Sequence, residues 1–153
     1  VTEINIKNLE YKSFSTPNNA SKECYNRPNS KTFKSIDSFS LDDRTLNLYQ
    51  ITISNNHGIK IKGLEDLLTW INDADNTNLY FVVPSNIFKT FPLQKYKTIK
   101  DEDSKTIPTW INKKITQYAL EINLDISNKS AKKRSSDAIS GDEETTEKGT
   151  NKD

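Results

Sequence analysis

Cysteine and histidine are almost missing from this chain of 153 residues. Cys24 is the only cysteine, so an intrachain disulfide and a cysteine-based zinc site are excluded. His57 is the only histidine, which excludes histidine-pair catalysis and multi-histidine metal sites. The four glycines stand singly, so the chain has no Walker-type phosphate loop.

Methionine and long apolar runs are missing as well. No segment approaches the roughly 20 apolar residues of a membrane helix, so no membrane partner is expected. No signal peptide is predicted, because no basic start precedes an apolar stretch. Since the chain begins at Val1 without a Met, we expect a C-terminal piece of a longer protein, whose other part would carry any address signal. The net charge of +1 gives no overall attraction to nucleic acid and leaves only a local basic cleft open.

Composition divides the chain into three parts. Residues 1–34 are rich in loop signals and predict an irregular N-terminal segment with one short strand at most. Residues 35–125 predict the folded domain, with a modest core because only 33% of the chain is hydrophobic and 28% is charged. Residues 126–153 have almost no large apolar side chains, so a disordered polar tail is expected.

The central part predicts an α/β fold. Alternating and helical spacings of its apolar residues indicate, in order, a hairpin of strands 35–41 and 46–54 around the turn 42–45, a helix over 64–74, a strand over 79–83, a short helix or packed loop within 85–106, a helix from 108 to about 115, and a last strand over 118–124. The continuous apolar run 79–83 is typical of a strand buried on both faces.

The hairpin turn also predicts which residues face one another. Centred on residues 43–44, it places Leu41 opposite Leu46, and Phe39 opposite Leu48. The same register places Asp37 opposite Gln50, and Thr52 opposite Ser35.

A polar cluster is therefore expected at the end of an apolar patch. The other face carries apolar side chains too (Ile36, Tyr49, Ile51 and Ile53), so the cluster is predicted to be part-buried. A part-buried carboxylate needs a partner. Mg²⁺ suits Asp37 and Gln50 because it prefers carboxylate and carbonyl oxygens plus waters, and it could position a water at a phosphate. Alternatively, Asp37 simply hydrogen-bonds Gln50 and Thr52, as polar pairs in hairpins often do.

Four motifs stand in order along the chain: LYQITIS at 48–54, NHGIK at 56–60, LYFVVP at 79–84, and IPTWI at 107–111 followed by QYALEI at 117–122. Together they resemble the C-terminal region of Crinkler proteins, the secreted effectors of oomycetes and fungi, over about residues 33–124. The resemblance implies a restriction-endonuclease-like (PD-(D/E)xK) core of hairpin, helix and buried strand, here with an extra C-terminal helix and strand. It also implies secretion, action in a host nucleus on DNA or a host nuclear protein, and an NTPase-like domain in the missing N-terminal part.

In that superfamily two acids hold Mg²⁺ and a lysine orients the attacking water. The resemblance places Asp37 at the first acid and Gln50 at the second, so these two are the implied metal ligands. Thr52 stands at the lysine position, and Lys60 or Lys62 is the substitute if the strand extends that far. The implied catalytic set is then Asp37, Gln50, Thr52 and Lys60.

This pattern departs from that of an intact nuclease. No proline precedes Asp37, Gln50 brings no charge and Thr52 cannot supply a positive one. Two functions stay open: Mg²⁺-dependent phosphodiester hydrolysis by a degenerate site, or a non-catalytic protein-interaction or structural module of a Crinkler effector.

A few other residues have a functional and a plain interpretation. His57 could assist a phosphate or simply serve a turn beside Gly58. Lys60 and Lys62 share a face that could touch a nucleic-acid backbone or lie in solvent. The spacing of Trp70, Trp110 and Phe81 favours packing over base stacking. The basic cluster 132–134 is a candidate nuclear-import signal, offset by the acidic residues 142–144.

Overall fold

The computed structural model describes residues 8–15, 20–29, 35–71 and 74–123. In chain order the elements are β1 (Glu10–Phe14), β2 (Cys24–Pro28), β3 (Ser38–Asp42), β4 (Thr45–Ile51), β5 (Ile59–Lys60), α1 (Ile61–Trp70), β6 (Asn76–Pro84), α2 (Ser85–Phe88), β7 (Tyr96–Lys97), α3 (Thr109–Lys114) and β8 (Ile115–Ile122). The predicted polar tail and its basic cluster lie outside the described residues.

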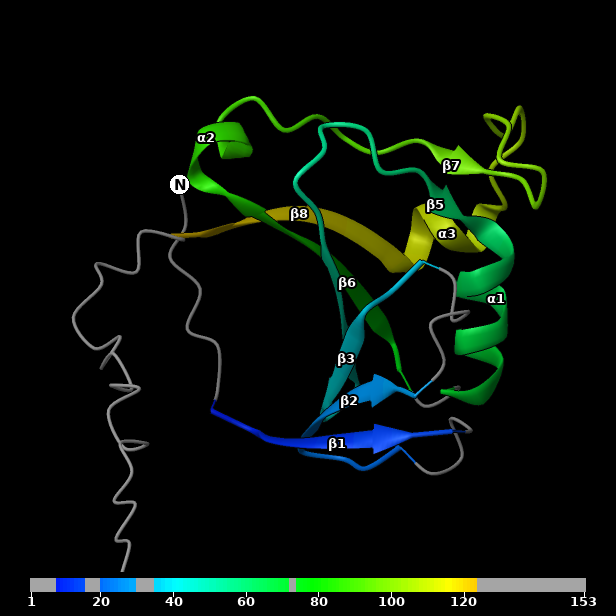
Figure 1. Cartoon of the computed structure of the whole chain (residues 1–153). Coiled ribbons are helices and arrows are strands. Elements are labelled where there is room, and N and C mark those ends of the chain that lie inside the picture. The colour runs from blue at the N-terminus through cyan, green and yellow to red at the C-terminus, as the bar shows by residue number, and fades with distance from the viewer. Residues whose placement is uncertain (1–7, 16–19, 30–34, 72–73, 124–153) are drawn as a thin grey trace, which may run out of the picture.

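A mixed sheet of six strands forms the centre of the molecule (Figure 1). Its order is β1-β2-β3-β4-β6-β8, in which β3 and β4 are antiparallel, while β4, β6 and β8 run parallel. Strands β5 and β7 form a separate two-stranded sheet. The predicted α/β class is therefore confirmed.

The hairpin register is confirmed where the two strands pair. Leu41 pairs with Leu46, and Phe39 pairs with Leu48. Both strands are shorter than predicted, because β3 begins at Ser38 and β4 ends at Ile51. Before the hairpin, Ser35 adopts a positive φ of 83°, which a strand residue does not have. The predicted pairing of Ser35 with Thr52 is therefore wrong.

Helix α1 begins three residues before its predicted start and connects β5 to β6. Its apolar side chains Leu64 and Leu67 are fully buried in one core with side chains of β4 and β6. Burial of one such leucine stabilises the fold by roughly 2 kcal/mol. Helix α1 lies in the crossover connection between β4 and β6. This connection lets β6 run parallel to β4 and pair with it.

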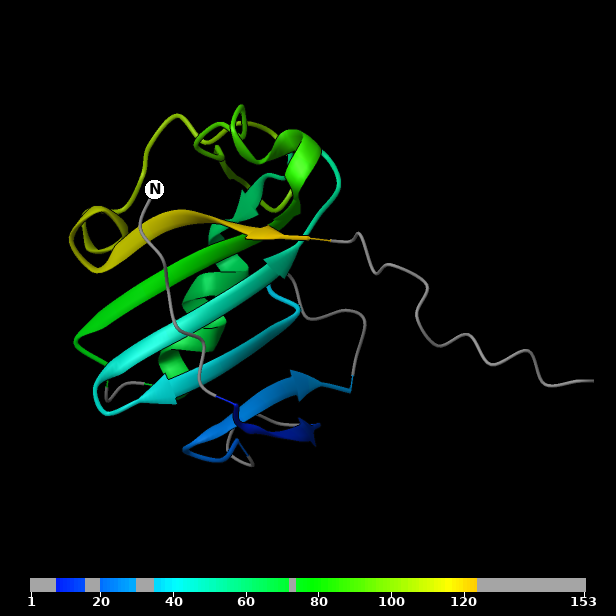
Figure 2. The ribbon, with the colours of Figure 1, turned by 90° about the vertical axis from the view of Figure 1, so that its left-hand side faces the viewer.

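No helix of the described residues covers the centre of one face of the sheet (Figure 2). The expectation that 79–83 is buried on both faces is wrong: Leu79, Phe81 and Val83 are buried, whereas Tyr80 and Val82 alternate with them and are only half-buried. The same openness exposes Ile51 to 64% on β4.

The N-terminal segment contributes two strands where one at most was predicted. Strands β1 and β2 run parallel and extend the sheet beyond β3. Phe14 anchors them, with its ring centroid 5.4 Å from that of Phe39 in an edge-to-face contact. The sequence signal was weak because β1 buries only Phe14, so its other side chains carry no apolar pattern.

Candidate functional site

Asp37 and Gln50 meet at the end of the hairpin, as predicted. Oδ2 of Asp37 accepts hydrogen bonds from Nε2 of Gln50 at 3.1 Å and from the backbone N–H of Ile51 at 2.7 Å. The backbone N–H of Asp37 donates to the carbonyl of Tyr49 at 2.8 Å, which continues the ladder by one residue. Asp37 is exposed, while Gln50 is only 7% exposed.

The amide of Gln50 turns its nitrogen, not its oxygen, toward the carboxylate. Its Oε1 atom is buried and has no hydrogen-bond partner among the described residues. Reversing the amide would bring Oε1 against the carboxylate oxygen of Asp37, which repels it, so the assigned orientation is the favourable one. The side-chain oxygen of Gln50, the atom expected to bind a metal, is therefore buried, while the nitrogen faces the acid.

Among the described residues, neither of the other two predicted catalytic side chains hydrogen-bonds to this pair. Thr52 is 8% exposed, and its hydroxyl accepts a hydrogen bond from the N–H of Ser54 at 3.1 Å, a local turn interaction. Lys60 lies in the small second sheet, where its Nζ is 3.5 Å from Oδ1 of Asp101. Ser35, expected beside Thr52, instead bonds the backbone of Lys60 through its hydroxyl.

These residues do not fit a Mg²⁺ site in the geometry they have. Mg²⁺ takes six oxygen ligands in near-octahedral geometry, several of them waters. Asp37 offers one carboxylate, and the Gln50 carbonyl oxygen is sealed on its other side. Within the described ranges, no group of three or more histidine, cysteine or acidic side chains could hold a metal ion.

His57 has a packing role in this structure. Its ring lies edge-on to Phe81 with the centroids 6.4 Å apart, and its backbone N–H donates to Oε1 of Gln94. Phe81 is 2% exposed, which confirms the predicted packing role of that residue.

Gln94 is a buried polar residue that the sequence patterns did not single out. Its Nε2 donates to the carbonyls of Asn55 at 3.1 Å and Pro92 at 2.8 Å. Its backbone exchanges two hydrogen bonds with the side chain of Gln117 on β8, at 2.9 and 3.1 Å. Gln94 therefore joins the loop after β4 to the last strand and fixes the loop that carries His57.

A row of four tyrosines crosses the open face of the sheet. The register pairs Tyr49 with Tyr80, and Tyr80 with Tyr118, on neighbouring parallel strands. Their rings stack, with centroids 5.5 Å apart and an 18° tilt in the first pair, and 5.3 Å apart with a 24° tilt in the second. Tyr25 of β2 extends the row with an edge-to-face contact to Tyr49 at 5.7 Å.

Small side chains on β3 let the row continue across that strand. Ser38 is the residue of β3 that pairs with Tyr49, so no large side chain separates Tyr49 from Tyr25. Ser40, the next residue on this face, lies 3.4 Å from the hydroxyl of Tyr49. Three of the tyrosines stand at corresponding positions in the sequence motifs LYQ, LYF and QYA. The sequence therefore contained a signal for the row, which the register of the hairpin alone does not reveal.

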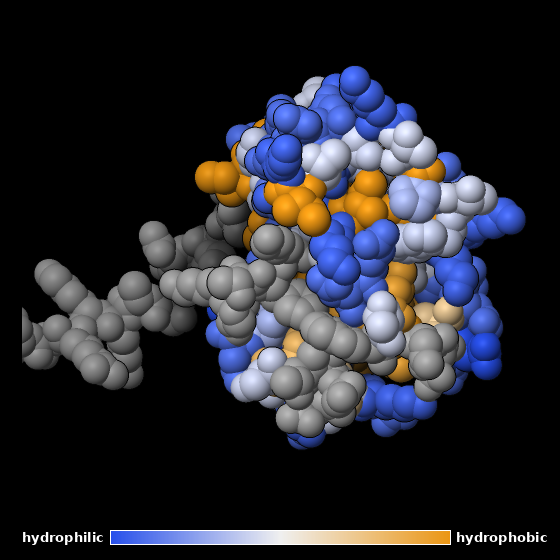
Figure 3. Space-filling model, turned by 90° about the vertical axis from the view of Figure 1, so that its right-hand side faces the viewer, coloured by the Kyte–Doolittle hydropathy of each residue, from blue (hydrophilic) through white to orange (hydrophobic). Residues whose placement is uncertain are grey.

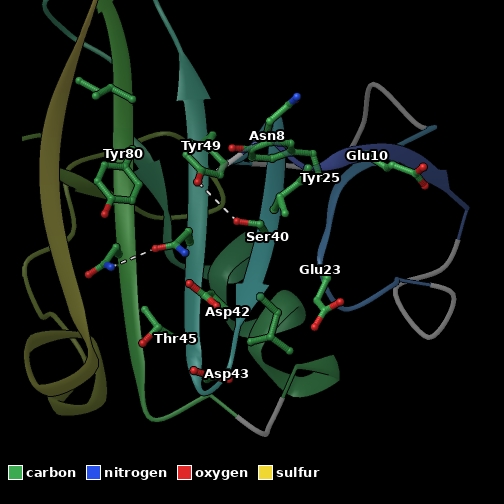
Figure 4. Close-up of a pocket in the computed structure, with 15 residues that line it drawn as sticks. Asn8, Glu10, Glu23, Tyr25, Ser40, Asp42, Asp43, Thr45, Tyr49 and Tyr80 are labelled. Atoms are coloured by element: carbon green, nitrogen blue, oxygen red, sulfur yellow. Dashed lines mark hydrogen bonds between the residues drawn. The ribbon is translucent and has the colours of Figure 1, made fainter. Parts of the chain in front are cut away.

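A cavity of about 670 Å³ lies beside this row (Figure 4). Asn47 and Asn78 join across β4 and β6 through a 3.0 Å hydrogen bond at its base. Its charged lining residues are all acidic: Glu10, Glu23, Asp42 and Asp43.

A second, more apolar cavity of about 480 Å³ adjoins the first, because both are lined by Tyr25, Tyr49 and Leu120. Its other lining residues are Ser38, Ile51, Val82, Glu121 and Ile122. We call the two cavities and the tyrosine row together the tyrosine groove. Among the described residues that line it, none is lysine, arginine or histidine.

Tyr25 and Tyr80 of the groove stay neutral over the physiological pH range. Burial, together with the neighbouring Tyr49, raises the pKa of Tyr25 to about 12. Burial and the hydroxyls of Tyr49 and Tyr118 also raise the pKa of Tyr80. These side chains therefore supply neutral hydroxyls, which donate or accept hydrogen bonds.

The side of the molecule that carries α1 is less suited to a ligand. Hydrophilic side chains interrupt the exposed hydrophobic ones there (Figure 3). A cavity of about 330 Å³ between α1 and α3 is lined by apolar residues such as Leu68 and Trp110, together with Glu65 and Lys114 of opposite charge. The mixed charges select no ligand class.

Comparison of the chain with protein-family models, curated proteins and solved structures gave no match. No helix in the described part of the chain is long and apolar enough to cross a membrane.

Proposed function

We propose that β3, β4, α1 and β6 form a restriction-endonuclease-like core of the Crinkler type. Four features support it. The two hairpin strands are antiparallel, a helix follows them, and the next long strand lies parallel to β4 and beside it. Asp37 precedes the first hairpin strand and touches Gln50 on the second, the two positions that the superfamily pattern gives to its acids.

We further propose that this core is used for binding rather than for phosphodiester hydrolysis. The observation that carries the proposal is the donor set at the end of the hairpin, where Asp37 meets the neutral amide of Gln50 in place of a second acid. The tyrosine groove supplies the alternative: a concave surface on the open side of the sheet with both apolar and hydrogen-bonding groups, as ligand sites have.

A cleavage assay tests this proposal directly. The full chain and its Asp37→Asn variant are incubated with supercoiled DNA and Mg²⁺ or Mn²⁺. Asn keeps the size of the side chain and removes the charge that a metal requires. We expect no nicking by either protein above the buffer control. Metal-dependent nicking by the wild type that the Asp37→Asn variant lacks would overturn the proposal.

Mg²⁺-dependent hydrolysis is the second candidate, favoured by the contact of Asp37 with Gln50 at the expected place. The same assay decides between the two candidates, because only hydrolysis depends on the Asp37 charge. Secretion, a nuclear site of action and a DNA or nuclear-protein partner stay predictions from the resemblance. A fluorescent fusion of the chain, with the basic residues at 132–134 replaced by alanine in a matched control, tests the nuclear part.

A further inference from the structure

The charged residues that line the tyrosine groove are acidic, and this limits the class of ligand that it can bind. Four carboxylate residues line its larger cavity: Glu10, Glu23, Asp42 and Asp43. The described lining contains no basic side chain, although lysine and arginine number 22 in the whole chain. Such a surface attracts cations and repels polyanions, nucleic acid included.

The four carboxylates come from separate elements. Glu10 is on β1, Glu23 directly precedes β2, and Asp42 and Asp43 are at the hairpin turn. Figure 4 shows Glu10 and Glu23 on the side of the cavity away from Tyr80. A ligand with several positive charges along an extended chain matches this spread better than a single cation does.

The rings of the row favour long aliphatic stems over flat rings. Tyr80 stacks between Tyr49 and Tyr118, so both of its faces are already covered. A nucleobase, which needs a free aromatic face, therefore finds none on Tyr80. The methylene stems of lysine and arginine can lie along ring edges while their charged heads reach carboxylates and tyrosine hydroxyls.

The apolar cavity adds one more requirement. Ile51, Val82, Leu120 and Ile122 line it beside Tyr49, and Ile51 and Ile122 are 64% and 42% exposed. Covering these side chains is favourable only for a ligand with an apolar group of its own. Because this cavity shares Tyr25, Tyr49 and Leu120 with the acidic one, one extended ligand can reach both.

We propose that the tyrosine groove binds a basic peptide segment that carries an apolar side chain, with lysine or arginine at the carboxylates and the apolar side chain in the cavity beside Tyr49. The proposal rests on the binding function proposed above and names the partner class of that site.

Fluorescence anisotropy of a labelled probe tests the peptide proposal with the full chain. The probe is an oligolysine peptide with one central leucine. Control probes replace its lysines by glutamate or its leucine by glycine, and a single-stranded oligonucleotide represents polyanions. We expect the lysine–leucine peptide to bind, the glycine control to bind more weakly, and the glutamate peptide and the oligonucleotide not to bind.

Variants locate the binding on the groove. The double substitution Glu10→Gln and Glu23→Gln removes two charges from exposed side chains and should weaken binding by about tenfold, with a further loss at higher salt. Glu102→Gln, a matched change in the connection between β7 and α3, should leave binding unchanged. Thermal melts of all variants establish that they are folded.

The possible results separate the two proposals. Binding of the lysine–leucine peptide that the groove variant weakens and the Glu102 variant retains supports both. If the oligonucleotide or the glutamate peptide binds instead and the groove variant alters it, the ligand class is wrong while the binding function stands. If no probe binds, or if binding ignores the groove variant, the peptide proposal is overturned, and nicking in the Asp37 assay would then overturn the binding function as well.

Discussion

The amide of Gln50 holds the carboxylate of Asp37 from one side only: Nε2 donates to Oδ2 at 3.1 Å, and Oε1 ends in the core without a described partner. A glutamate at this position would place a second carboxylate against the first. Two carboxylates at that separation cannot both be charged without a cation between them. The neutral amide therefore removes both the repulsion and the reason to bind a metal.

Gln50→Glu should convert this pair into a cation-dependent one. We expect the free energy of unfolding at pH 7 to fall by about 2 kcal/mol, since a buried acid beside Asp37 must stay protonated or be repelled. Millimolar Mg²⁺ or Ca²⁺ should then raise the melting temperature of this variant and leave that of the wild type unchanged. In the double variant with Asp37→Asn, the repulsion and the metal response should both disappear. A melting temperature of the wild type that rises with Mg²⁺ would contradict this account.

Gln94→Ala should be among the most damaging changes of a single polar residue. The substitution removes three side-chain hydrogen bonds at a 5% exposed position and leaves the Asn55 and Pro92 carbonyls and the His57 N–H without their partner. Each of these three hydrogen bonds contributes about 1 kcal/mol net, so a total loss of about 3 kcal/mol is expected. Urea unfolding monitored by tryptophan fluorescence measures it.

Thr90→Ala provides a matched control for the Gln94 variant. Its hydroxyl makes a single exposed hydrogen bond to the carbonyl of Ile87 at 3.3 Å. We expect a loss below about 0.5 kcal/mol. An equal effect of both substitutions would show that the Gln94 network does not hold the loop.

The sequence predicted the central hairpin better than it predicted which face of the sheet is open. The apolar pairs of the hairpin specify its register, because slipping Leu46 and Leu48 by one residue would turn both out of the core. Turn residues likewise predicted where that hairpin closes. Such patterns depend only on residues that are neighbours in the chain. Continued along the hairpin, they correctly predicted the contact of Asp37 with Gln50.

What the sequence did not reveal depends on contacts between distant segments. The run 79–83 has the composition of a strand buried on both faces, yet no described helix covers the centre of one face, so Tyr80 and Val82 line an open groove. Gln94 is buried only because β8 brings Gln117 to it from 23 residues away. Periodicity along one strand cannot report whether another element covers it, nor which loop a glutamine reaches.

The effect of Gly58→Ala on stability should depend on the residue at position 97: destabilising beside Lys97 and stabilising beside alanine. A Cβ at Gly58 would lie 2.4 Å from Cγ and 2.7 Å from Cε of Lys97, so the lysine side chain must move and loosen its ion pair with Asp103. We expect a loss of about 1 kcal/mol in the wild type. With Lys97→Ala the clash is gone, and the lower chain entropy of alanine should stabilise the fold by about 0.5 kcal/mol. Urea unfolding of the four proteins of this double-mutant cycle measures the coupling. Additive effects would show that Lys97 is not what Gly58 accommodates.

Protonation of Asp103 should make the fold less stable below pH 4. Hydrogen bonds from Lys95 and Lys97 lower the pKa of this carboxyl from 3.8 to about 2. Since the folded state holds the proton less tightly than the unfolded state, the stabilisation is complete above pH 3.8 and is lost as the pH falls toward 2. The urea midpoint should therefore decrease across that window. Asp103→Asn should already be less stable at pH 6 and should show a smaller further decrease, whereas Asp43→Asn, at the hairpin turn, should retain the full wild-type slope. A wild-type slope in the Asp103→Asn variant would mean that the two lysines do not stabilise the fold through this carboxylate.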